Sequence, residues 1–386
     1  MFREACQALA EQIIQWRRDF HKHPELSFQE KRTREVIASF LRDCGLEVRE
    51  QRAGYGVIGE LRGAKPGPTI AFRADMDALP IQEETGLSFS SQVPGVMHAC
   101  GHDAHMAVLM GAVRILSGMR DKMKGNVRFI FQPAEELSPG GAQGMIKEGA
   151  LDGVAAIFGI HIWSEFPVGT FHTVSGPIMA AADEFKIVIN GKGGHGALPH
   201  QTIDSILVAS HLMMAAQHIV SRQLNPLESG VISFGFIHAG EAYNVIAHKA
   251  TLGGTIRSFT EETRNLLTER LRHTATSIAQ LYGADIHLEV ERGYPPVVNH
   301  EQETLLALDI AKQVFGEEKI NIMQPMMAAE DFSYYLEQVP GAFCFVGAGE
   351  IDKPKYPHHH PRFTIDERAL PLATEWFCQM AKAYLF

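Results

Sequence analysis

The sequence has few cysteines and no long apolar run. Its five cysteines, at positions 6, 44, 100, 344 and 378, are widely scattered, which excludes a small secreted domain built on disulfides. Their odd number fits a reducing compartment, and no apolar run approaches the roughly 18 residues that a membrane span needs. Apolar residues recur every three or four positions from Phe2 to Phe20, which indicates an amphipathic helix rather than a signal peptide. We therefore expect a cytoplasmic protein without a membrane partner.

Positive charge is also scarce. The chain carries 35 Lys and Arg against 45 Asp and Glu, so its formal net charge at pH 7 is −10. A negative protein surface repels the phosphates of nucleic acids and of anionic membranes. We therefore expect no nucleic-acid partner, and we turn to binding sites for small molecules and metals.

Residues 98–105, with the sequence His-Ala-Cys-Gly-His-Asp-Ala-His, concentrate three imidazoles, a thiol and a carboxylate. Cys100 and His102 lie two positions apart, so in an extended loop both side chains point to one side. The apolar run from Ala104 to Leu116 predicts a helix, which places these groups at a helix entrance. The alternative, a buried cysteine beside surface histidines, is less favoured because further ligand-type residues follow downstream.

Three predicted strands are each followed by polar residues. The strands span 69–73, 126–131 and 155–160, and the residues after them are Asp75, Asp77, Glu135, Glu136 and His161. In open α/β sheets, ligands bind at the carboxyl ends of the strands. We expect these side chains to meet there. Asp75 and Asp77 alternate on one side of an extended segment, so they either bind metal directly or orient histidine ligands, and the histidine-rich loops favour the second role.

The pattern of the chain changes near Asp183. The following residues predict a strand at 184–190, a helix at 202–220, strands at 231–237 and 245–256, a helix at 261–281 and a strand at 284–290. This β-α-β-β-α-β order makes a small α+β domain. We therefore predict an α/β protein in which a central mixed sheet flanked by helices is formed by residues 1–182 and 293–386. Residues 183–292 would form an inserted, smaller lid domain.

The ligand-type residues suffice for two metal ions. Six of the 19 histidines fall within 98–105 and 358–360. A closed structural zinc site would use four Cys or His ligands, whereas a mixed set of carboxylate, imidazole and thiolate suits a catalytic centre. Two metals about 3.5–4 Å apart suit hydrolysis. One of Glu135 and Glu136 would then bind metal while the other acts as general base; if both bound metal, no base would remain.

Six motifs resemble the aminoacylase/carboxypeptidase superfamily, most closely its amidohydrolase branch of hippurate hydrolase, N-acyl-amino-acid amidohydrolase and plant indole-acetyl-amino-acid hydrolases. They cover residues from about 20 to 367 in the expected order. The motifs are His23-Pro-Glu-Leu, Arg73-Ala-Asp-Met-Asp-Ala-Leu-Pro80, His98-Ala-Cys-Gly-His-Asp-Ala-His105, Gln132-Pro-Ala-Glu-Glu136, Gly193-Gly-His-Gly-Ala197 and Ala329-Glu-Asp-Phe332.

The resemblance implies a two-domain enzyme with a dinuclear metal centre and a lid through which such proteins often form homodimers. It implies Glu135 as the base, Cys100 as the bridge between the metals, and Asp75 and Asp77 beside the ligands rather than on the metals. The implied metal ligands are Cys100, His102, Glu136, His161 and His359. His359 matches the family pattern of His, one residue, then Pro, although His358 or His360 could replace it by a small shift.

In the lid, the resemblance implies that His195 polarises the scissile carbonyl, from the same chain or from a partner subunit; the alternative is a histidine in a hairpin turn. Asn244 and Arg257 resemble positions that bind the substrate carboxylate, which an arginine can grip with two hydrogen bonds. Arg257 is almost equally well explained as an ordinary residue on the face of a strand.

The predicted function is metal-dependent hydrolysis of N-acyl amino acids, with zinc, manganese, cobalt or nickel as the two divalent ions. The alternatives are a dipeptidase or carboxypeptidase-like peptide hydrolase, and a protein that binds metal or acyl amino acids without turnover.

Overall fold

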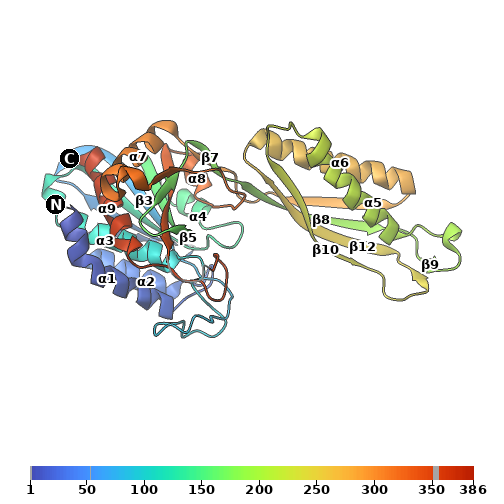
Figure 1. The fold of residues 1–386 in the computed structure, drawn as a ribbon, viewed down its shortest axis with the longest axis horizontal. Helices are drawn as coiled ribbons and strands as arrows, with labels where there is room; N and C mark the ends of the chain where they lie inside the picture. The colour runs from blue at the N-terminus through green and yellow to red at the C-terminus, as the bar shows by residue number, and fades with distance from the viewer. Residues whose placement is uncertain (1, 53, 351–355) are drawn as a thin grey trace. The chain divides into compact units, whose positions relative to one another are not determined.

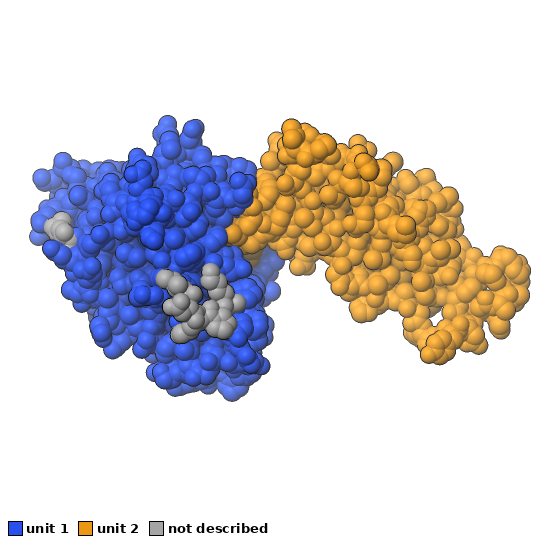
Figure 2. Space-filling view, in the orientation of Figure 1, with its two compact units in different colours: residues 1–178, 298–324, 331–386 blue, residues 179–297, 325–330 orange. Residues whose placement is uncertain are grey.

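The computed structural model describes residues 2–52, 54–350 and 356–386. The chain divides into two compact units, each with its own hydrophobic core, coloured separately in Figure 2. The first contains Met1–Ile178, Val298–Gln324 and Asp331–Phe386, and the second contains Met179–Val297 and Pro325–Glu330. The sequence placed the borders of the inserted domain at 183 and 292, and it gave no sign that 325–330 packs with that unit. Within the described ranges, no helix is long and apolar enough to cross a membrane.

The first unit is built on an eight-stranded mixed sheet with the strand order β1-β2-β4-β3-β5-β16-β6-β15. Neighbours β4, β3, β5 and β16 are parallel, whereas the pairs β1–β2, β2–β4 and β16–β6 are antiparallel. The predicted central mixed sheet is therefore confirmed. Its strands are β1 (Glu47–Glu50), β2 (Val57–Arg62), β3 (Lys65–Asp75), β4 (Lys124–Gln132), β5 (Val154–Pro167), β6 (Phe171–Thr173), β15 (Ile320–Ile322) and β16 (Gly341–Gly349).

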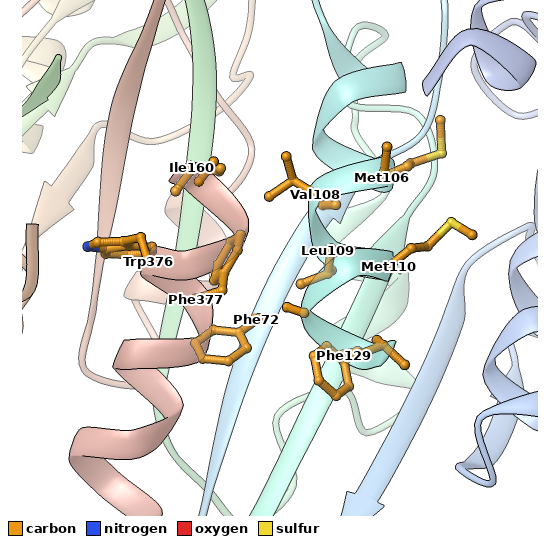
Figure 3. Close-up of a cluster of buried hydrophobic side chains, with 14 of the residues drawn as sticks. Phe72, Met106, Val108, Leu109, Met110, Phe129, Ile160, Trp376 and Phe377 are labelled. Carbon is orange, nitrogen blue, oxygen red and sulfur yellow. The ribbon is translucent and has the colours of Figure 1, made fainter. Parts of the chain in front are cut away.

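Helices flank this sheet (Figure 1). They are α1 (Phe2–Lys22), α2 (Lys31–Asp43), α3 (His102–Ser117), α4 (Ala142–Lys147), α7 (Glu301–Phe315), α8 (Ser333–Leu336) and α9 (Ala369–Leu385). Helices α1, α3 and α9 pack on one another, and α3 and α9 also contact β3. In Figure 3, Phe72 of β3 and Phe129 of β4 lie among side chains of α3 and α9. Almost every residue of α3 is buried, because this helix is covered on several sides.

The parallel strands β4, β3 and β5 are adjacent in the sheet, so their carboxyl ends meet at one edge. In register, Asp75 at the end of β3 lies opposite Gln132 at the end of β4. One detail differs from the sequence prediction. Strand β5 does not end before His161 but continues to Pro167, and His161 lies opposite Phe345 of β16. Pairing with β16, which comes from the C-terminal part of the chain, extends β5 beyond its apolar run.

The second unit has a four-stranded antiparallel sheet of order β10-β12-β8-β13 that contacts α5 and α6. The elements are β8 (Ala181–Asn190), α5 (Ser205–His218), β10 (Gly230–Ala239), β12 (Lys249–Ser258), α6 (Glu261–Tyr282) and β13 (Asp285–Glu291). The predicted β-α-β-β-α-β order is confirmed. The predicted strand 245–256 is in fact two: β11 (Val245–Ile246), which pairs with β9 (Gly194–His195), and β12. Two short strands, β7 (Gly176–Met179) and β14 (Val297–Asn299), lie at the unit borders.

Candidate metal centre

Cys100 and His102 lie where a loop enters α3. Gly101 between them has a φ of 89°, a left-handed conformation that glycine adopts without strain, and His102 is the first residue of the helix. The Nδ1 atom of His102 lies 2.9 Å from the backbone oxygen of Asp77, to which it donates. Its Nε2 atom is buried and has no hydrogen-bond partner among the described residues. A buried nitrogen of this kind is available to a metal ion.

Glu136 and His359 complete a first group of donors with Cys100. The ligand atoms of these three residues lie within 4.8 Å of one another. Oε1 of Glu136 is 3.2 Å from Nε2 of His359 and 3.8 Å from Nε2 of His102. This oxygen is also buried without a hydrogen bond among the described residues. The His359 side chain reaches Glu136 because the backbone of His359 adopts a φ of 65° and its N–H donates to the backbone oxygen of Ala99.

Cys100 also belongs to a second group, with His161 and His358. Nδ1 of His161 lies 3.0 Å from the backbone oxygen of Ile162, so it donates there and Nε2 is directed to the thiol, 3.5 Å from Sγ. The His358 ring stacks on Trp163 at a centroid distance of 4.2 Å, and its Nε2 accepts from the N–H of Ser164. The thiol of Cys100 therefore stands between two neighbouring sets of donors.

These donors fit divalent metal ions. They combine thiol sulfur, imidazole nitrogen and carboxylate oxygen. Among the described residues, Nδ1 of His358 and the pair of His102 Nε2 and Glu136 Oε1 are buried without a hydrogen-bond partner. Buried polar atoms without partners are costly, so such a pair indicates a bound group. Glu135 lies beside them, since its carboxylate, Glu136 and His102 form another group within 4.8 Å.

Asp75, His102 and His105 also lie close together, but their hydrogen bonds argue against a metal there. His105 donates from Nδ1 to Asp75 at 2.6 Å and accepts at Nε2 from the N–H of Ile162 at 2.8 Å, so both of its nitrogens are used. The other carboxylate oxygen of Asp75 accepts from Arg73. Asp75 therefore braces the centre instead of offering a free ligand atom.

Asp77 holds the backbone that carries the two glutamates. Its Oδ1 accepts from the N–H of Glu135 at 3.0 Å, and its Oδ2 accepts from the N–H of Glu136 at 2.9 Å and from the Ser27 hydroxyl at 2.7 Å. Burial alone would raise the pKa of Asp77, but its interactions with His102 lower it, so the carboxylate stays ionised. Asp77 thus fixes the backbone of Glu135 and Glu136, and with it the direction in which their side chains point.

The protonation states of the ligands follow from their surroundings. Burial and the charges of Glu136 and Glu135 raise the pKa of the Cys100 thiol well above its ordinary value. Burial would lower the pKa of His102, yet the charges of Asp75, Asp77 and Glu136 raise it to about 10. Burial, with the charges of neighbouring histidines, lowers the pKa of His161 well below its ordinary value. Cys100 and His102 therefore hold protons that a cation would displace, whereas His161 is neutral.

The three predicted lid residues lie in the second unit. His195 and Asn244 are neighbours there, because His195 pairs with Val245 across β9 and β11 and the N–H of Gly196 donates to the Asn244 oxygen. Arg257 lies on β12, half-buried, and its Nε donates to the Thr255 hydroxyl. Burial lowers its pKa, which the charges of acidic neighbours partly offset. His195 and Asn244 are exposed.

Sequence reasoning assigned no role to two residues that bear on the centre. Glu30 is fully buried and accepts at 2.8 Å from the N–H of Ala134, next to Glu135. No local pattern marks it, because it lies at the start of an ordinary surface helix. Asp331 accepts from Arg73 and Gln132, the residues that flank Asp75 in the sheet. The buried-type strand before Gln132 and the acidic pair at 330–331 were the available signals.

Comparison with known proteins shows the family to which the chain belongs. Residues 71–383 match the model of Peptidase family M20/M25/M40. The chain is 44% identical to thermostable carboxypeptidase 1 of Saccharolobus solfataricus, over 93% of this chain and 92% of that protein. It is 42% identical to the N-acetylcysteine deacetylase of Bacillus subtilis, over 98% of each chain. The crystal structure of the Bacillus subtilis YxeP protein, described as a dinuclear metal binding peptidase from the M20 family, superposes with a TM-score of 0.85 at 38% identity, covering 97% of this chain and 98% of that one. The chain is therefore a member of Peptidase family M20/M25/M40.

Proposed function

We propose that the protein removes the acyl group from N-acyl amino acids, using two divalent metal ions and Glu135 as general base. The chain is a hydrolase that acts on amides, as its family and its similarity to a deacetylase indicate. The observation that carries the finer proposal is the pair of buried ligand atoms without partners, His102 Nε2 and Glu136 Oε1, beside a second carboxylate.

Five side chains would hold the ions: Cys100, His102, Glu136, His161 and His359. Cys100 belongs to both groups of donors and is the proposed bridge. When bound, the ions activate a water molecule and polarise the carbonyl oxygen of the scissile amide. The thiol favours zinc, whereas the carboxylate and imidazoles also accept manganese, cobalt or nickel. The dinuclear centre ascribed to the related YxeP protein supports two ions.

The remaining residues position groups and move protons. Glu135 takes a proton from the attacking water and delivers it to the leaving nitrogen. Asp77 holds the backbone of Glu135. The hydrogen-bonded pair of Asp75 and His105 lies beside the proposed ligands and supports them. In the second unit, we propose that Asn244 and Arg257 bind the substrate carboxylate and that His195 polarises the carbonyl. We also propose that this unit is the lid and that it mediates homodimer formation, which size-exclusion chromatography with light scattering tests.

A pair of isosteric variants tests the roles of the two glutamates. Glu135→Gln should retain both metals and its fold while losing hydrolysis by about 10²–10⁴-fold, because only proton transfer is removed. Glu136→Gln should lose metal as well as activity. Full activity of Glu135→Gln with bound metal contradicts the role of Glu135 as base.

Peptide hydrolysis is the second candidate, because a carboxypeptidase is among the relatives. Relative kcat/KM values on N-acetyl amino acids, N-benzoyl amino acids and free dipeptides separate the two functions. A preference for blocked amino termini supports the proposal, and a preference for free dipeptides supports the peptidase. Metal-loaded protein that binds members of this panel but hydrolyses none of them would be a binding protein.

A further inference from the structure

Three consecutive backbone N–H groups, those of Ala134, Glu135 and Glu136, are held by two buried carboxyl groups. Asp77 accepts hydrogen bonds from the N–H groups of Glu135 and Glu136, and Glu30 accepts one from the N–H of Ala134 at 2.8 Å. Successive N–H groups of this kind form a concave anion-binding nest when one residue is left-handed, and Ala134 has a φ of 55°. We propose that Glu30 is a positioning residue for the general base, which it orients by fixing Ala134 in this conformation. The inference rests on the proposed role of Glu135.

The left-handed conformation of Ala134 needs an external hold. A residue with a Cβ atom adopts it rarely, and such strain persists only where surrounding contacts enforce it. The hydrogen bond from Ala134 to Glu30 is buried and links positions 104 residues apart. Without it, the turn is free to relax to a right-handed conformation. The peptide plane between Ala134 and Glu135 then rotates and moves the base away from the water, and small displacements of a catalytic group cost large factors in rate.

The contacts of α2 show that Glu30 does not serve to cap this helix. Glu30 is the residue before this helix, but its side chain does not cap the helix. Glu25 does so instead, since its carboxylate accepts from the N–H groups of Arg32 and Thr33 at 3.0 and 2.8 Å. The Glu30 carboxyl is therefore free to turn towards residues 134–136.

The segment containing Glu30 is also hydrogen-bonded to residues 77 and 78. The N–H of Ala78 donates to the Glu25 oxygen, and the Ser27 hydroxyl donates to Asp77. Burial and the charge of Asp77 raise the pKa of Glu30 to about 8, so it is a neutral acid at pH 7 that complements the ionised Asp77. Glutamine closely imitates a neutral glutamic acid in shape and in its acceptor oxygen.

The test compares Glu30→Ala and Glu30→Gln in the full-length, metal-loaded protein. With an amide substrate that the wild type hydrolyses, we expect Glu30→Ala to lower kcat by about 10–100-fold, with KM within about threefold and the metal content unchanged. Glu30→Gln should stay within about threefold of the wild type. Hydrogen exchange of a peptide covering residues 131–137 should be faster in Glu30→Ala than in Glu30→Gln.

Glu25→Ala is the matched control, because it removes a half-buried carboxylate from the same segment but not from the nest. It should lower the thermal midpoint and leave kcat within about threefold. If Glu30→Ala does not fold, Glu30→Asp carries the test, since it keeps the acid but shortens its reach, and its kcat should fall.

Three results would overturn the proposal. They are a wild-type kcat in Glu30→Ala (or in Glu30→Asp, where that variant carries the test), a loss of kcat in Glu30→Gln equal to that in Glu30→Ala, or an equal loss of kcat in Glu25→Ala. Exchange at residues 131–137 reports on the Glu30–Ala134 contact without any activity. Hydrogen exchange therefore tests the Glu30–Ala134 contact independently of the role of Glu135, even if Glu135→Gln shows that Glu135 is not the base.

Discussion

The Sγ atom of Cys100 lies 3.5 Å from Nε2 of His161, although the two residues are 61 positions apart. Both residues are buried, and Cys100 also belongs to the group with Glu136 and His359. If Cys100 is the bridge between both ions, as proposed, Cys100→Ser should bind fewer than two metals per chain and lose at least about 10–100-fold in metal affinity. Metal analysis after dialysis measures this. Cys44→Ser, at a half-buried thiol after α2, is the control and should bind as the wild type does.

The three adjacent histidines should differ in function. His359 lies 3.2 Å from Glu136, whereas His358 already accepts a hydrogen bond from Ser164 and His360 stacks on Tyr356. We predict that His359→Ala loses one metal and at least about 10³-fold in kcat/KM. His360→Ala should be near wild type. If His358→Ala loses the metal while His359→Ala keeps it, the ligand is His358 and the family-based assignment is wrong.

Metal affinity should rise with pH. Burial would lower the pKa of His102, but the charges of Asp75, Asp77 and Glu136 raise it to about 10. Burial and the charges of Glu136 and Glu135 raise the pKa of Cys100 well above its ordinary value. Both groups therefore carry protons at pH 7 that binding must release. Affinity should increase by about tenfold per pH unit for each displaced proton between pH 6 and 9. Chelator competition and proton release into weak buffer measure this, and a flat profile would contradict it.

Glu30 should impose a pH dependence on stability. Its pKa is raised from 4.5 to about 8 in the folded protein by burial and by Asp77. Between these values the unfolded chain is ionised while the folded protein keeps the proton. Stability is therefore full below about pH 4.5 and is lost as the pH rises towards 8. Relative to Glu30→Gln, the free energy of unfolding of the metal-free wild type should fall by on the order of a few kcal/mol over this range. Urea unfolding of both proteins at several pH values tests it, and parallel curves would refute it.

Arg257 offers a test of the substrate assignment. If its guanidinium grips the substrate carboxylate with two hydrogen bonds, Arg257→Lys keeps the charge but loses the paired geometry. We predict that KM for N-acyl amino acids rises by about 10–100-fold with a smaller change in kcat. The corresponding N-acyl amino-acid amides, which lack that carboxylate, should be hydrolysed equally by both proteins. Arg270→Lys, at an exposed position of α6, is the control.

Much of the architecture could be predicted because it is encoded locally. Apolar runs gave the parallel strands β3, β4 and β5, and the β-α-β-β-α-β pattern gave the second unit. Pairing between distant segments was less accessible. The extension of β5 through His161 depends on β16, and the packing of 325–330 with the second unit depends on residues far away in the chain.

The candidate site shows the same division. Cys100, His102, Glu135 and Glu136 stand in short motifs, and the structure gathers them with His161 and His359. Their roles remain predictions. The triple histidine could not be resolved from spacing, since only the fold shows that Nε2 of His359 lies beside Glu136 while Nε2 of His358 accepts from Ser164. Glu30 was missed because no periodicity relates it to Ala134.

The order of the proposed ligands along the chain has a consequence for assembly during synthesis. Cys100, His102, Glu136 and His161 precede the second unit, whereas His359 follows it. A growing chain therefore exposes four of the five donors while the entire second unit is still being translated. The proposed centre can be complete only after position 359 has been translated, so a chain truncated between the second unit and His359 would carry four of its five proposed ligands and bind metal incompletely.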